Sequence, residues 1–241
     1  DFDENVNESE LMKAVDGANT YHYEDGRTGP EGGADMQEDM TLYKDEMRVW
    51  SNLALKGIDN AMSGLATMVN QQIKIKSLSL RQVPAKEAPQ LIGDPEKLVI
   101  GIYLTFEGDA TGHILLVHQP EVAFAIIDML LGNTPGSTQS LEEMEQSALA
   151  ELGNVIGSSF LNAIADALGL SLRPSPPDVI LDMAGAILDV AVVEILQESE
   201  DVFVSETAFG TDDRQANGTF LVIPSVSFLK VILEHSGVRQ P

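Results

Sequence analysis

A carboxylate and a carboxamide three residues apart are the strongest candidates for chemistry in this 241-residue chain. At about 100° of rotation per residue, a helix places Glu151 and Asn154 on one narrow ridge, together with Ser147 and Ser158. Polar residues on one side of an amphipathic helix are usually only solvated. Gly153 indicates a role beyond solvation, because glycine and asparagine in mid-helix cost about 1 to 1.5 kcal/mol relative to good helix formers. A small residue beside a short amide suits close approach by another surface.

The opposite side of this helix is apolar and is expected to face a core, as is one side of an earlier helix. The apolar stripes are Leu149, Leu152, Ile156, Phe160 and Ala163 in the later helix, and Leu55, Ile58, Met62, Leu65 and Val69 in the earlier one. The expected outer ridge of the earlier helix reads Leu53, Gly57, Asn60 and Gly64. Because Gly57 stands three residues before Asn60, where the later helix has Glu151, Asn60 marks a degenerate first site. Any activity that needs an acid with an amide then belongs to the later helix alone.

Four short matches recur in the same order along the chain and indicate a tandem duplication. They pair Asp59-Asn60 with Gly153-Asn154, 78–81 with 170–173, 112–115 with 218–221, and 120–124 with 224–228. The repeats cover about residues 47–138 and 139–236. The sequence therefore predicts an α+β fold of two layers, with long helices packed on a β-sheet and with pseudo-twofold symmetry.

Each repeat is expected to contain a long helix, several strands and a short closing helix. Runs rich in β-branched and aromatic residues predict strands at 98–106, 113–117, 187–193, 202–205 and 219–223. Closing helices are predicted to start at Pro120 and Pro224, since proline is tolerated in the first turn.

The first 46 residues differ in composition from the rest of the chain. They contain 14 of the 38 acidic residues and three of the 14 basic ones, with a glycine-rich stretch at 26–33. We expect an acidic arm over 1–46 that is disordered or loosely docked, with a short helix near Glu8 to Val15. The folded domain is predicted to span 47–241.

Composition excludes several classes of function. A formal charge of −24 opposes binding to nucleic acids and to anionic membranes. The chain has no cysteine, and its four histidines are far apart without a metal-ligand spacing, so no metal site is expected. No phosphate-binding glycine motif and no nucleophile elbow occurs.

The spacing Ser147-x3-Glu151-x2-Asn154, followed after 22 residues by Pro177, resembles the phosphatase signature of the CheC, CheX and FliY family of chemotaxis proteins. The duplicated architecture resembles that family too, and the segment Asp128 to Gly132 is similar to the one that ends its first half. The resemblance covers about residues 47–236. It implies a CheC-like fold and an enzyme that hydrolyses the aspartyl phosphate of the response regulator CheY.

The resemblance also assigns roles to individual residues. Asn154 would orient a water molecule for attack on phosphorus, because a carboxamide has no useful basicity. Glu151 would pair with a lysine of the partner and fix the helix in register. Ser147 would cap or trim the ridge, and Pro177 would shape the loop after the first strand of the second repeat. No cofactor is expected on this chain, since magnesium belongs to the partner response regulator.

A second class of function stays open, a noncatalytic chemotaxis adaptor that binds CheD or a CheY-like protein. The pair of Glu151 and Asn154 favours the phosphatase, because an adaptor has no need of it. The expected partners are therefore phosphorylated CheY and, in the second case, CheD. Neither nucleic acid nor a membrane is expected as a partner, and the cytoplasm is the expected location.

Overall fold

The computed structural model describes residues 35–195, 201–210 and 218–235. Its internal contacts divide the chain into two units, Asp1–Lys44 and Asp45–Pro241. The second unit contains the features that follow, apart from residues 35–44 at the start of the first described helix. The acidic arm over 1–46 falls almost entirely in the first unit, and the helix predicted near Glu8 to Val15 lies outside the described residues.

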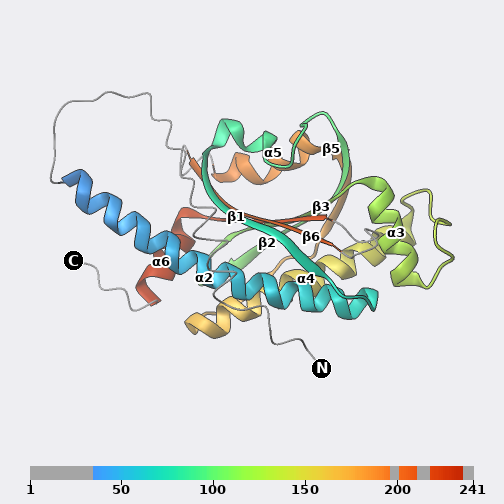
Figure 1. The fold of residues 1–241 in the computed structure, drawn as a ribbon, viewed down its shortest axis with the longest axis horizontal. Helices are drawn as coiled ribbons and strands as arrows, with labels where there is room; N and C mark the ends of the chain where they lie inside the picture. Colours follow the sequence, from blue (N-terminus) through green and yellow to red (C-terminus); the bar gives the residue numbers. More distant parts are fainter. Residues whose placement is uncertain (1–34, 196–200, 211–217, 236–241) are drawn as a thin grey trace. The chain divides into compact units, whose positions relative to one another are not determined.

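Helices and strands alternate along the described residues in two similar series (Figure 1). The first series is α2 (Asp35–Val69), β1 (Lys74–Pro84), the 3-10 helix η1 (Ala85–Gln90), β2 (Leu98–Gly108), β3 (Gly112–His118) and α3 (Pro120–Leu131). The second is α4 (Glu143–Leu168), β4 (Leu172–Pro174), β5 (Asp178–Met183), α5 (Ala184–Ile195), β6 (Asp201–Gly210), β7 (Gly218–Pro224) and α6 (Val226–His235).

The strands form one antiparallel sheet in which the two series are interleaved. The strand order is β1-β6-β7-β3-β2-β4. Strand β5 also pairs with β2: β4 pairs with its residues Phe106–Gly108 and β5 with its residues Leu98–Tyr103. The counterparts in the two series are β1 and β4–β5, β2 and β6, and β3 and β7. Exchanging each strand for its counterpart gives the same order, read from the opposite edge of the sheet. The axis of this symmetry passes between β3 and β7, where Leu115 is paired with Leu221. This is the arrangement expected of a tandem duplication with pseudo-twofold symmetry, and the α+β class is confirmed.

Both faces of the sheet carry helices. The long helices α2 and α4, with α3 and α6, cover one face, and Figure 1 shows α5 on the other. The larger core includes Trp50, Ile102, Phe160, Phe220 and Phe228. The smaller one includes Leu115, Ile187, Leu188, Leu221 and Ile223. The predicted two layers are thus present on the face of the long helices, and α5 with η1 adds cover on the other face.

The strand predicted at 187–193 is wrong, because this segment lies in the helix α5. Its β-branched residues suggested a strand. The hydrophobic residues of α5 that are described as buried follow the first of them by three, four, seven and eight positions, as in a helix with one face on a sheet. They are Ala184, Ile187, Leu188, Ala191 and Val192.

The closing helix of the second repeat starts later than predicted. Pro224 still pairs with Gly112 in the sheet, and α6 begins at Val226. The N–H of Phe228 donates a hydrogen bond of 3.1 Å to the hydroxyl of Ser225, which therefore caps the helix. In the first repeat, α3 does begin at Pro120, as predicted.

Candidate functional site

The helix α4 is fixed at both ends by its own sequence. Glu142 and Glu145 form a capping box at the start, and Gly169 ends the helix with a φ of 69°. Its predicted apolar stripe is buried, with Leu149 and Phe160 both at 0% exposure. Among the described helices, α4 is the one that is long and apolar enough to cross a membrane. Its packing on the sheet accounts for that apolar character.

Two glycines allow α4 to lie close to the sheet. A Cβ atom at Gly157 would lie 2.9 Å from Leu104, and one at Gly153 would collide with Ile102. Both partners are on β2, so the surface that approaches Gly153 belongs to this chain. The close approach of another surface that Gly153 suggested is therefore present, and the surface is β2 of this chain. The place of Gly153 in mid-helix is explained by contact between α4 and β2.

Glu151 and Asn154 lie exposed along one side of a shallow cleft. The cleft has a volume of about 520 Å³ and is lined by Ser147, Ala150, Glu151 and Asn154 from α4 and by residues 174–177. Within the described part of the chain, neither the Glu151 nor the Asn154 side chain has a hydrogen-bond or ionic partner. Both polar groups are therefore available to a ligand or a partner.

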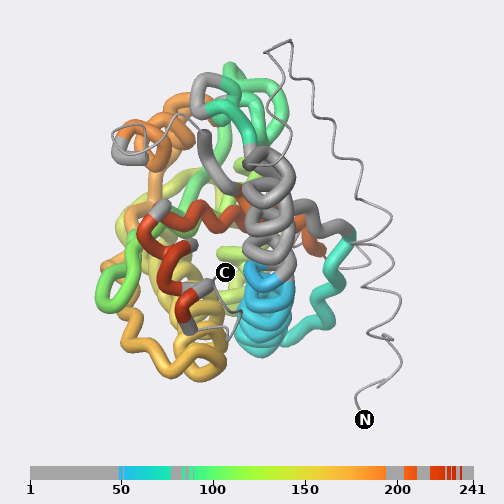
Figure 2. Tube along the Cα trace, turned by 90° about the vertical axis from the view of Figure 1, so that its left-hand side faces the viewer, coloured from blue at the N-terminus to red at the C-terminus, as the bar shows by residue number. Residues whose placement is uncertain are grey.

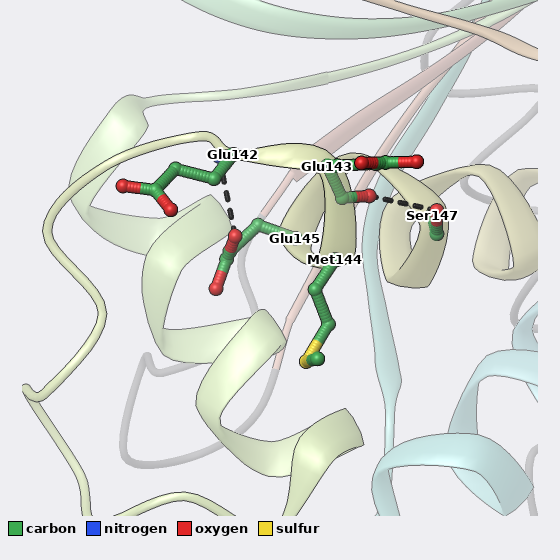
Figure 3. Close-up of a pocket in the computed structure, with 5 residues that line it drawn as sticks. All are labelled: Glu142, Glu143, Met144, Glu145 and Ser147. Carbon is green, nitrogen blue, oxygen red and sulfur yellow. Dashed lines mark hydrogen bonds between the residues drawn. The ribbon is translucent and has the colours of Figure 1, made fainter.

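Ser147 lies one turn before Glu151 and is not the helix cap. Its hydroxyl donates a hydrogen bond of 2.7 Å to the carbonyl of Glu143 (Figure 3). The capping position belongs to Glu142, whose N–H is bound by the Glu145 carboxylate at 3.2 Å. Ser147 also borders a second surface cleft of about 550 Å³, which is lined by these acids and Met144.

Pro177 lies in a break between two strands and contacts α4. The break covers residues 175–177, between the end of β4 and the start of β5. Pro177 Cβ and Cγ lie 3.3 and 3.4 Å from the position of a Cβ at Gly153, next to Asn154. Sequence reasoning singled out Pro177 but missed Pro174, Ser175 and Pro176, which line the same cleft. Three prolines in four residues were the available signal for a break in the strand.

The earlier helix does not present the ridge that its sequence predicted. Gly57 is buried, and a Cβ there would lie 2.6 Å from the ring of Phe160 on α4. A Cβ at Gly64 would lie 3.1 Å from the Ser159 hydroxyl. Leu53 packs against the larger core. Of the four predicted ridge residues Asn60 alone is exposed, because α2 and α4 pack side by side (Figure 2). The position of the missing acid is thus closed by α4.

The connection that leads into α4 is held by a buried carboxylate. Asp128, 3% exposed near the end of α3, accepts hydrogen bonds from the Thr138 hydroxyl and the Gly136 N–H, both at 2.6 Å. The Thr138 N–H and the Ser137 hydroxyl donate to it at 3.1 and 3.2 Å. The hydrogen bond from the Thr138 side chain, with the others, holds the pKa of Asp128 below its usual value, against the opposing effect of burial.

The part of the chain that the structure describes has no cluster of side chains suited to bind a metal ion. No group of three or more His, Asp or Glu residues there is arranged to hold an ion. His113 and His118 are buried on β3, and the hydroxyl of Tyr103 lies 2.8 Å from His113 Nδ1. Within the described part of the chain, the charged and amide side chains that line the cleft are those of Glu151 and Asn154.

Three crystal structures share this fold. The FliY structure from Thermotoga maritima matches with a TM-score of 0.62 and 16% identity, over 81% of this chain and 98% of that one. The FliM middle domain from H. pylori matches at 0.54 and 14%, over 80% and 98%. The CheX structure from Desulfovibrio desulfuricans matches at 0.51 and 14%, over 72% and 99%.

Sequence comparison gives a closer relationship. The model of the CheC-like family matches residues 144–181, which contain Glu151, Asn154 and Pro177. The CheY-P phosphatase CheC of Bacillus subtilis (strain 168) is 30% identical over 176 residues, which are 72% of this chain and 84% of that protein. This chain belongs to the CheC-like family of chemotaxis proteins.

Proposed function

We propose that this protein is a phosphatase that accelerates hydrolysis of the aspartyl phosphate on the response regulator CheY. The observation that carries the proposal is the exposed pair of Glu151 and Asn154 on one cleft, both with free side chains among the described residues. The CheC relative from Bacillus subtilis, which is named as a CheY-P phosphatase, supports the substrate. Action on a response regulator would place the protein in the cytoplasm.

Asn154 has the chemistry to orient a water molecule. Phosphoryl transfer has a loose transition state, so it is accelerated mainly by positioning and by stabilisation of charge. The Asn154 carbonyl would accept a hydrogen bond from the attacking water and direct its oxygen at phosphorus. The new P–O bond forms as the bond to the acyl oxygen breaks, which releases phosphate, the partner's free aspartate and a proton. Asn154 itself takes up no proton.

Glu151 has the chemistry to hold the partner. Among the described residues that line the cleft it is the only charged one, and it lies one turn from Asn154 on the same side of α4. A lysine at the partner's phosphate site would form an ion pair with it. Magnesium in this proposal is bound by the response regulator, next to its own phosphorylated aspartate.

A noncatalytic adaptor for CheD or a CheY-like protein is the second candidate. It is favoured by the fold, which also occurs in the middle domain of FliM. Asn60, exposed on α2 with Gly57 in place of an acid three residues earlier, would then belong to a binding surface rather than to a second active site. The free Glu151 and Asn154 pair favours the phosphatase.

The deciding experiment is phosphate release from phosphorylated CheY, with the wild-type protein and with Asn154→Ala. We expect the wild type to accelerate release and the variant to lose about 100-fold of the saturating rate, since one positioned polar group typically contributes that much. Association with CheY should remain. The matched control is Asn60→Ala, which removes the equivalent exposed amide on α2 and should leave the rate unchanged.

Two results would contradict the proposal. Wild-type protein that binds CheY without accelerating phosphate release would identify an adaptor. Equal losses in Asn154→Ala and Asn60→Ala would show that the two helices contribute alike, against the one-site interpretation.

A further inference from the structure

The two halves of the protein differ most clearly in the first strand of each repeat. In the first half this strand is continuous, as β1 over Lys74–Pro84. In the second half it is divided into β4 and β5 by Ser175, Pro176 and Pro177. The two prolines have no N–H to donate, so they cannot continue the ladder with β2. The break lies beside the cleft that contains Glu151 and Asn154.

Ser175 attaches this break to the sheet by two hydrogen bonds to one residue. Its N–H donates to the Thr105 carbonyl of β2 at 2.8 Å. The Thr105 N–H donates to the Ser175 hydroxyl oxygen at 3.0 Å. The side chain thus replaces the backbone acceptor that a regular strand would offer to Thr105. The hydroxyl in turn donates to the Pro176 carbonyl at 3.2 Å, within the break itself.

The attachment of Ser175 determines where the neighbouring prolines lie. Two residues further on, Pro177 packs against Gly153, which directly precedes Asn154 on α4. Gly153 also contacts Ile102 of β2. Its contacts with Ile102 and Pro177 together set the distance between this turn of α4 and the sheet. A chain of contacts therefore runs from Thr105 through Ser175 and Pro177 to the turn that carries the carboxamide.

We propose that Ser175 is a positioning residue for the phosphatase reaction: by tying the 175–177 break to Thr105, it holds Pro177 against Gly153 and so fixes Asn154 in the cleft. Ser175 does not touch the reacting atoms. The inference rests on the proposed function, which it deepens by one residue. Orientation of a water depends steeply on distance, whereas an ion pair made by Glu151 tolerates small shifts. Loss of the hydroxyl should therefore lower the turnover rate more than the affinity.

The test compares Ser175→Ala with Ser175→Thr in the full chain, using phosphorylated CheY as substrate. The saturating rate of phosphate release and the half-saturating CheY concentration are measured for each, with the melting temperature as a check on folding. We expect Ser175→Ala to lower the saturating rate about 10-fold, a fraction of what a 1 Å displacement can cause. The half-saturating concentration should change by less than about twofold. Ser175→Thr keeps the hydroxyl acceptor and should restore most of the rate.

Two further variants separate positioning from stability. Ser175→Cys keeps the shape of the side chain with a somewhat larger atom that is a weak acceptor, so it should be as slow as Ser175→Ala while remaining folded. Thr67→Ala is the matched control, since it removes an exposed hydroxyl on α2 that binds only the Ser63 carbonyl at 2.9 Å. Its rate should equal that of the wild type.

The outcomes distinguish this inference from the proposed function. If Ser175→Ala and Ser175→Cys, measured where they are folded, turn over at the wild-type rate, the positioning role is wrong and the phosphatase stands. The same holds if Ser175→Thr is as slow as Ser175→Ala. If the wild type itself does not accelerate release, the proposed function fails and this inference fails with it.

Discussion

Gly153 connects the fold to the candidate chemistry at the scale of single residues. It lies between Glu151 and Asn154 in sequence, and its missing side chain is what lets α4 touch Ile102 and Pro177. Any larger residue would push the helix away from the sheet or displace Pro177. The glycine that suggested close approach by another surface thus sets the height of both polar groups above the sheet. The cost of glycine in mid-helix is thus offset by packing.

Glu151 can be tested separately from Asn154. We expect Glu151→Ala to raise the half-saturating CheY concentration about fivefold, in the range of an exposed ion pair, with a smaller effect on the saturating rate. Added salt should weaken the wild type more than the variant, because salt screens the pair. Steady-state phosphate release at two ionic strengths measures both effects. Glu121→Ala, which removes an exposed acid from α3, is the matched control.

Results at the two ionic strengths can also refute the role of Glu151. If Glu151→Ala lowers the saturating rate as much as Asn154→Ala and leaves the half-saturating concentration unchanged, Glu151 acts in the chemical step. Its assignment as a docking group would then be wrong.

The sequence could predict that Ser147, Glu151 and Asn154 are exposed on the later helix, and could not predict what the glycines contact. Helical periodicity alone places Ser147, Glu151 and Asn154 opposite the apolar stripe. Nothing local distinguishes Gly57, which faces Phe160 of α4, from a residue that faces water. Contacts between helices depend on how α2 and α4 are placed by the sheet, and one sequence without that geometry does not contain the answer.

At the scale of elements, α5 shows the limit of composition as a guide. Valine and isoleucine favour strands in general, but the apolar positions of α5 repeat with a helical period. The difference decides the architecture, because a helix in this place covers the second face of the sheet. The broken strand β4–β5 could be anticipated from its prolines. The hydrogen bonds of Ser175 could not, since its partner Thr105 is 70 residues away.

The connection between α3 and α4 gives a prediction with a pH dependence. Asp128→Asn should destabilise the protein at pH 7, because an amide cannot accept all four hydrogen bonds and an unmade bond to a buried donor costs about 1–3 kcal/mol. The pKa of Asp128 is lowered in the folded state, so its stabilisation is present well above the usual aspartate pKa of about 3.9. It is lost as the pH falls through the lower folded-state pKa.

Urea unfolding of the wild type and Asp128→Asn at pH 7 and pH 3 measures this effect. The difference between the two proteins should shrink at the lower pH, where the carboxylate begins to be protonated. A difference of the same size at both pH values would mean that the charge of Asp128 does not contribute to stability. Asp166→Asn, at an exposed position late in α4, is the control.

At the scale of the whole molecule, two similar halves share one sheet but differ in the outer residues of their long helices. Strand β1 pairs with β6 of the other half, and β4 and β5 pair with β2, so neither half has a complete sheet of its own. An aromatic cluster also joins them: Phe228 of α6 meets Trp50 and Phe106 edge to face at 5.6 and 5.3 Å. Because the halves share one core, α2 packs against α4 at Gly57, the position where α4 has Glu151. In the proposed function, α2 serves packing and α4 carries the site.

The boundary of this cooperative unit can be tested by truncation. The second unit begins at Asp45, and the first residue described as buried is Trp50, at 1% exposure. Deletion of residues 1–44 should therefore leave the melting temperature within about 3 °C and phosphate release within about twofold of the full chain.

Deletion of residues 1–54 also removes Trp50 and Ala54 from the core and is the matched comparison. It should lower the melting temperature by about 10 °C, as loss of a buried tryptophan typically costs 3–5 kcal/mol. Thermal unfolding followed by circular dichroism measures both. If the shorter deletion destabilises the protein as much as the longer one, residues before Asp45 contribute to the core and the two-unit division is wrong.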